Sequence, residues 1–152
     1  MITRQRAGAA VVAAVGALGV TASAYLNWYD GDDATQFRLE RLFQTDATGE
    51  PTSYWNSMAM PLAVVAVLGI VGALLLSRFV LSLGWLIGVA VLVLWAVMSS
   101  ADDAIAFSVG DVQAGAWVCA AALLVMLAGI VALRGRDRDT VAPDPVEPPD
   151  LP

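Results

Sequence analysis

Four long apolar segments dominate the pattern of hydrophobic and polar positions along the chain. They cover about 7–26, 57–76, 79–98 and 114–133, and none of them contains Asp, Glu, Lys or Arg. Each has about 20 residues, the length that an α-helix needs to cross a bilayer. A membrane β-barrel would show short alternating segments instead. The pattern therefore predicts an all-α integral membrane protein, a four-helix bundle with four spans.

The composition supports this class and excludes several chemistries. The 152 residues are 59% hydrophobic and 14% charged, whereas a soluble domain carries about 45–50% apolar and about 25% charged residues. The chain has no His and one Cys, which excludes Ser-His or Cys-His catalysis and a disulfide within one chain. It has neither a Gly-rich phosphate loop nor a basic nucleic-acid face. We expect no enzymatic activity, no cofactor and no nucleic-acid partner.

The positive charges predict the orientation of the spans. The chain has no lysine, and most of its arginines precede the first span, separate the second from the third, or follow the fourth: Arg4, Arg6, Arg78, Arg134, Arg136 and Arg138. Under the positive-inside rule, both termini and the short turn at Arg78 are cytoplasmic. The loops at 27–56 and 99–113 then face outward from a bacterial plasma membrane.

The first apolar segment has a second interpretation. Arg4 and Arg6, an apolar run and Ala22-Ser23-Ala24 have the layout of a secretory signal, and cleavage after Ala24 would leave three spans. The run is closer to a full span than to the apolar region of about 7–15 residues that a signal carries. We expect residues 1–136 to form one four-span domain.

Residues 137–152 differ from the rest of the chain. They are rich in Pro and acidic residues and contain few apolar ones. Such a segment cannot bury a core, so it is predicted to be a disordered cytoplasmic tail.

Aromatic residues gather where the spans meet the predicted outer surface. They are Tyr25, Trp28, Tyr29, Tyr54, Trp55, Trp95 and Trp117. Amphipathic rings prefer the headgroup region, which favours an outer aromatic belt over a ligand-binding cage. Trp85 lies nearer the cytoplasmic side, and we expect it to pack against a neighbouring helix or lipid.

Small residues predict where helices approach each other closely. Gly84 and Gly88 form a GxxxG step in the third span. This step could serve packing within the chain or an interface with a partner. Further small surfaces are expected at Gly16, Gly19, Gly69, Gly72 and Gly115.

The first outer loop carries the most distinctive sequence. Asp33 and Gln36 are compatible with a helix N-cap and capping box. Apolar and charged residues mix after them, which predicts a short amphipathic helix that lies on the membrane surface or caps the bundle. The candidate interaction residues of this loop are Phe37, Arg38, Arg41 and Phe43.

Acidic residues of the two outer loops form a candidate cation site. They are Asp30, Asp32, Asp33, Asp102 and Asp103. Calcium takes six to eight oxygen ligands, but Ala34 and Thr35 stand where a calcium-binding loop requires a third ligand and a glycine. No metal is therefore assigned, and Arg38 or Arg41 could instead pair with one of these acids.

The arginine-only, Ala/Val/Gly-rich spans, the Trp28-Tyr29-Asp30-Gly31 exit, the Leu39-Glu40-Arg41-Leu42-Phe43 element and the Pro/Asp tail support a resemblance. Together they resemble the small four-span integral membrane proteins of actinobacteria. The resemblance implies a bacterial envelope as the location and implies no catalytic residues.

Two functions fit these features. The first is a non-enzymatic accessory or interaction protein that lies in the lipid bilayer and associates with a larger membrane complex or with copies of itself. The second is a small-solute or cation-handling protein that uses the outer acidic cluster. Coupled transporters normally bury an ionisable group in the membrane, and the four spans contain no Asp, Glu, Lys or Arg. This difference favours the first function.

Overall fold

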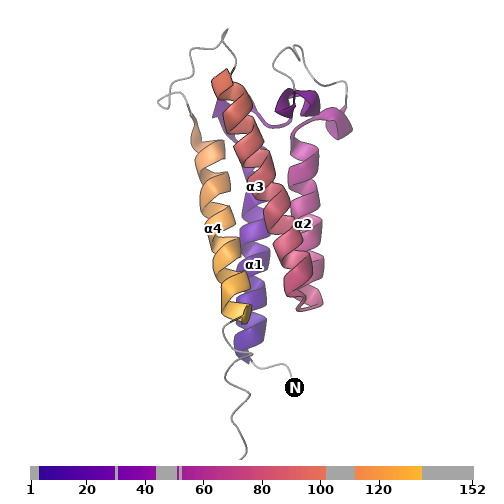
Figure 1. Ribbon diagram of the computed structural model, residues 1–152, viewed down its shortest axis with the longest axis vertical. Coiled ribbons are helices and arrows are strands. Elements are labelled where there is room, and N and C mark those ends of the chain that lie inside the picture. The colour runs from indigo at the N-terminus through magenta and orange to yellow at the C-terminus, as the bar shows by residue number, and fades with distance from the viewer. Residues whose placement is uncertain (1–3, 30, 44–50, 52, 102–111, 135–152) are drawn as a thin grey trace, which may run out of the picture.

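The computed structural model describes residues 4–29, 31–43, 51, 53–101 and 112–134, and the chain is mostly helical. Helix α1 covers Arg4–Ser23, α2 covers Ala59–Leu74, α3 covers Arg78–Ala101 and α4 covers Ala114–Arg134. The helices run side by side along the long axis of the molecule (Figure 1). Helix α1 packs against α4 and α2, and α3 packs against α2 and α4.

Three of the helices are long enough and apolar enough to cross a membrane: α1, α3 and α4. Helix α2 is also apolar but has only 16 residues. It therefore extends about 24 Å at 1.5 Å per residue, against a hydrocarbon core of about 30 Å. It is shorter than the predicted segment 57–76 because 57–58 lead into the helix and 75–76 form the turn that follows it.

The turn between α2 and α3 is tight, as its length predicted. The Leu76 backbone has a φ of 51°, in the left-handed region, and the Ser77 N–H donates a hydrogen bond of 2.9 Å to the Gly72 carbonyl. This pattern closes a helix by satisfying carbonyls of its last turn. Helix α3 begins at the next residue, so α2 and α3 form an antiparallel hairpin.

The closest contacts between helices occur at glycines of α1, α2 and α4. A Cβ added at Gly129 would lie 2.5 Å from the Ala13 backbone nitrogen, and one at Gly69 would clash with the Ala17 Cβ. Glycine therefore lets α4 and α2 approach α1 more closely than any other residue would. Such packing is typical of membrane helices, where lipid offers no hydrophobic driving force and van der Waals contact holds helices together.

One end of the bundle carries a cap, defined here as residues 25–43 and 53–57 as far as they are described. Strands β1 (Asn27–Tyr29) and β2 (Asp32–Asp33) form an antiparallel pair in the cap, with Asn27 opposite Asp33. The cap also contains two short 3-10 helices, η1 (Leu39–Leu42) and η2 (Tyr54–Asn56). We call this the cap end, and the opposite end, which contains the α2–α3 turn, the turn end.

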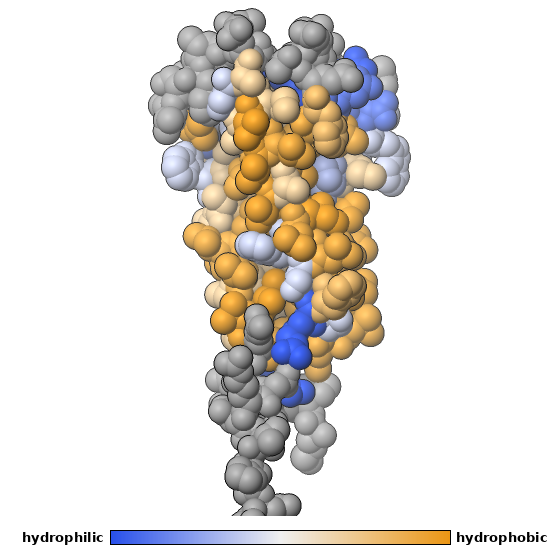
Figure 2. Space-filling view, in the orientation of Figure 1, coloured by the Kyte–Doolittle hydropathy of each residue, from blue (hydrophilic) through white to orange (hydrophobic). Residues whose placement is uncertain are grey.

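The surface of the bundle is divided by polarity. Figure 2 shows mostly apolar side chains over the middle of the helices in this view, with hydrophilic ones gathered toward two ends. Large apolar side chains are exposed on every helix, among them Val15, Val67, Leu86 and Leu124. An apolar middle between two polar ends is the distribution that a bilayer favours.

Candidate functional site

Backbone hydrogen bonds attach the cap to the ends of the helices. The Ala34 N–H donates to the Ala24 carbonyl at 3.1 Å, and the Gln113 N–H donates to the Trp28 carbonyl at 3.0 Å. The Met58 N–H donates to the Phe37 carbonyl at 2.9 Å. These bonds join three segments that are far apart in the sequence, so the cap is a fixed part of the fold.

A buried tryptophan pair lies beneath the cap. Trp28 is 0% exposed, and its indole N–H donates a hydrogen bond of 2.7 Å to the Ser23 carbonyl. Its ring meets Trp95 edge to face, with centroids 5.2 Å apart. Gly115 of α4 leaves the space for it, since a Cβ there would lie 2.7 Å from the Trp28 Nε1.

The belt interpretation is therefore wrong for Trp28 and Trp95, which are core residues. The reason is the turn after α1, which leads into β1 and directs the Trp28 side chain inward over the end of the bundle. The exposed Tyr25, Trp55 and Trp117 keep positions that a belt requires.

The predicted amphipathic helix of the first loop is instead a single 3-10 turn. Asp33 belongs to β2 and does not cap a helix, although its backbone N–H does donate to the Gln36 Oε1 at 3.3 Å. Arg38 is extended and pairs with Ser57 in an isolated β-bridge. The chain must stay extended to make this bridge, so the turn cannot begin before Leu39.

The four candidate interaction residues of the loop have different roles. Phe37 is buried, and the Arg41 guanidinium carbon lies 5.4 Å from the centre of its ring. Arg38 forms an ion pair of 2.8 Å with Glu40. Phe43 is 66% exposed. Of the two phenylalanines, only Phe43 presents its ring for an interaction.

The structure does not bring the candidate cation ligands together in the part that it describes. Asp30, Asp102 and Asp103 lie outside the described residues. The Asp33 carboxylate accepts hydrogen bonds from the backbone N–H and the hydroxyl of Thr35, and Asp32 is exposed. The described residues contain no group of three or more side chains that could hold a metal ion.

The predicted GxxxG step faces the interior of the chain. A Cβ at Gly84 would lie 3.1 Å from the Leu68 Cβ of α2, and one at Gly88 would lie 2.7 Å from the Leu123 Cδ2 of α4. Trp85 packs against a neighbouring helix, because its indole N–H donates to the Leu123 carbonyl at 3.1 Å. Both glycines therefore serve packing within the chain.

Exposed aromatic side chains remain on the cap. They are Tyr25, Phe43, Tyr54 and Trp55, which we call the cap aromatics. Partial burial and a hydrogen bond with Tyr25 raise the pKa of the Tyr54 hydroxyl above its ordinary value, so this hydroxyl stays neutral further into the alkaline range. The cap thus presents uncharged aromatic rings on a fixed backbone.

Sequence patterns missed the roles of two glycines, Gly115 beneath the cap and Gly129 within the bundle. Gly115 was noted as a small residue, but only the fold shows that it accommodates the indole of Trp28. Gly129 gave no signal in the sequence, because neither residue four positions away from it is small and no GxxxG step is formed.

In comparisons with known proteins, no family model, curated protein or solved structure matches this chain.

Proposed function

We propose that this chain is a four-span, non-enzymatic protein of the bacterial plasma membrane that acts as an accessory or interaction subunit of a larger membrane complex. The observation that supports the proposal most is the cap. It is fixed to the helices by backbone hydrogen bonds and presents the cap aromatics. Aromatic side chains on a rigid support lose little entropy on binding, and they are enriched at protein interfaces.

The interior of the bundle favours binding at the surface over passage of a solute. Apolar side chains fill its middle, among them Ala17, Val20, Leu62, Val65 and Met126, all fully buried. Within the described residues, every buried side-chain nitrogen or oxygen has a hydrogen-bond partner. The residues in the middle of the bundle therefore already pack against one another or form hydrogen bonds.

The proposal includes α2 as a fourth span. Helix α2 packs along α1 and α3, which are both candidate spans. The apolar residues on either side of α2, Met58, Leu75 and Leu76, can extend its apolar length toward that of its neighbours. The proposal also retains α1 as a span and not as a cleaved signal. Helix α1 packs against both α4 and α2, and its loss would expose Gly69 and Gly129.

The test is affinity purification of the tagged chain from native membranes, with mass spectrometry of what is recovered. We expect one stoichiometric partner. A double variant, Phe43→Ala with Trp55→Ala, should lower its recovery at least about tenfold, because aromatic anchors typically cost about 2 kcal/mol when truncated. The matched control is Phe79→Ala, since Phe79 is 79% exposed at the turn end, against 66% for Phe43 in the cap.

Each outcome has a defined meaning. Absence of any partner, in a detergent that preserves known complexes, would contradict the accessory role. Recovery of only the same chain would identify a homo-oligomer instead. Equal losses for the cap variant and for Phe79→Ala would show that the cap is not the interface. Substitution of Gly84 or Gly88 is unsuitable here, because both contact neighbouring helices of the same chain.

A further inference from the structure

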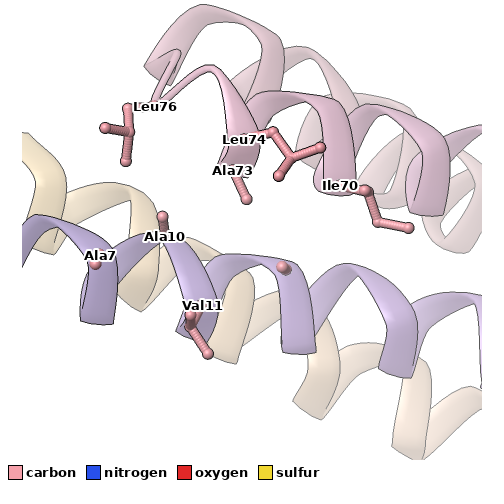
Figure 3. A pocket seen from close by; sticks show the side chains of 8 residues that line it. Ala7, Ala10, Val11, Ile70, Ala73, Leu74 and Leu76 are labelled. Atoms are coloured by element: carbon pink, nitrogen blue, oxygen red, sulfur yellow. The ribbon is translucent and has the colours of Figure 1, made fainter.

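An apolar groove lies between α1 and α2 near the turn end. It has a volume of about 360 Å³ and is lined by Ala7, Ala10, Val11, Ala14, Ile70, Ala73, Leu74 and Leu76. Figure 3 shows Ala10 and Ala73 from opposite walls, with Leu76 at one end. The groove forms because α1 and α2 touch at Ala17 and Gly69, beyond which small alanine side chains leave the space between the helices unfilled.

The groove is open toward the side of the bundle that lipid would contact. Val11, Ile70 and Leu74 line it and are exposed. The lining contains no polar side chain. From Ala7 to Ala14 it follows about 10 Å of helix, out of the ~15 Å that one leaflet contributes to the hydrocarbon core. Its length and chemistry suit part of an acyl chain.

A second, smaller cavity lies beside this groove at the turn end, and the two share one lining residue, Leu76. It has a volume of about 110 Å³ and is lined by Arg6, Leu76, Arg78 and Leu133. Leu76 lines both spaces, so the apolar groove and a cavity flanked by two arginines from different helices are neighbours at this residue. Each arginine also has an interaction with the rest of the chain. A guanidinium offers five N–H donors, so a phosphate can be added to an existing contact.

We propose that the groove and the cavity together bind one anionic phospholipid. Its phosphate lies between Arg6 and Arg78, and one acyl chain lies in the groove between α1 and α2. Charge complementarity selects this occupant, because two guanidinium groups at the end of an apolar groove match a phosphate attached to a hydrocarbon chain. A lipid without a phosphate, or an apolar partner helix, would fill the groove but offer no anion to the arginines. In a zwitterionic phospholipid the ammonium group of the headgroup offsets the negative charge of the phosphate and weakens the attraction.

This inference rests on the membrane placement in the proposed function, and it does not depend on a protein partner. A chain that recovers a partner but binds no lipid selectively would overturn only the lipid site. A chain that binds the lipid but recovers no partner would overturn only the accessory role.

The test uses the full chain, purified in a neutral detergent and titrated with phosphatidylglycerol or with phosphatidylcholine of the same acyl length. Native mass spectrometry measures how many lipids remain bound, and thermal unfolding measures stabilisation. We expect saturable binding of one phosphatidylglycerol. Arg6→Gln and Arg78→Gln should each weaken it about fivefold, which corresponds to about 1 kcal/mol per basic residue.

Matched controls separate the site from general attraction. Arg4→Gln removes the same charge from α1, but Arg4 does not line the cavity, so phosphatidylglycerol binding should be unchanged. Ala73→Leu should fill the groove and abolish selective retention, while Ala128→Leu, at an exposed position of α4, should not. Ala7→Leu is a second groove-filling variant, at an exposed position that the fold tolerates.

Three results would overturn the proposal. The first is equal binding of phosphatidylcholine and phosphatidylglycerol. The second is an equal loss in Arg4→Gln and in Arg6→Gln, which would indicate attraction to the whole turn end. The third is inorganic phosphate stabilising the chain as strongly as the lipid, which would identify a free-anion site in which the groove has no part.

Discussion

At Gly16, α1 lies so close to α4 that an added Cβ would sit 2.7 Å from the Met126 Cα. Backbone atoms cannot move aside as a flexible side chain can, so even one methyl group must push the helices apart. Gly8, in the same helix, has nothing within 4 Å of an added Cβ. Two glycines of one helix therefore have opposite roles, and only their neighbours distinguish them.

This difference gives a prediction about single residues. Gly16→Ala should lower the free energy of unfolding by about 1–3 kcal/mol, the usual cost of overpacking. Gly8→Ala should be neutral or stabilising by up to about 1 kcal/mol, because alanine has the higher helix propensity. Denaturant titration in mixed micelles measures both. Equal effects of the two substitutions would show that the α1–α4 contact is not as close as described.

At the scale of elements, the cap is formed by tertiary contacts and not by strong local propensity. Strand β1 has three residues, β2 has two, and each 3-10 helix is a single turn. None of these would be stable in isolation. They are held by the bonds to Ala24, Trp28 and Phe37, and by the indole of Trp28 against Trp95 and Gly115.

Trp28→Phe should therefore destabilise the cap. It removes the hydrogen bond to the Ser23 carbonyl and leaves a gap beside Trp95, for a total of about 1–3 kcal/mol. Trp117→Phe is the matched control and should change stability by less than about 0.5 kcal/mol, because Trp117 is 61% exposed. Near-ultraviolet circular dichroism during denaturation follows both variants. A Trp28→Phe chain as stable as the control would contradict the role of the pair.

At the scale of the whole molecule, the chain separates its charges from its apolar surface. The helices present apolar side chains to their surroundings, and arginines lie at both ends: Arg6 and Arg78 line one cavity at the turn end, and Arg38 and Arg41 belong to the cap. Under the proposed topology, the positive-inside rule predicts that the turn end is cytoplasmic. With four spans, the cap and its aromatic side chains are then expected to face outward.

A topology reporter tests this orientation directly. A periplasm-active reporter inserted after Asp46 should be active, and one fused after the C-terminal residue should be inactive. A cytoplasm-active reporter should give the reverse pattern. Cytoplasmic reporting after Asp46 would overturn the orientation, and opposite sides for Arg78 and the C-terminus would show that the number of spans is not four.

The helices could be predicted to a large extent, whereas the cap could not. Long uncharged runs identify helices through composition alone, so Phe79–Met98 and Ala114–Leu133 agree closely with α3 and α4. The prediction of a helix after Asp33 was wrong, because it rested only on local sequence signals, the capping pattern and the mixture of apolar and charged residues. The Arg38–Ser57 bridge that overrides them joins positions 19 residues apart. The loop acids at 30 and 102–103 lie outside the described residues, so the cation site stays a prediction.

The sequence by itself determined the class of this protein, its helical segments and the placement of its arginines, because apolar length and charge are properties of the chain. Only the tertiary structure decided which glycines permit close contact, that Trp28 and Trp95 are buried, and that Arg6 and Arg78 share a cavity beside an apolar groove. These features depend on which helix faces meet. Small residues are spread over every face of these helices, so their pattern cannot select one pairing, and only the packed arrangement does so.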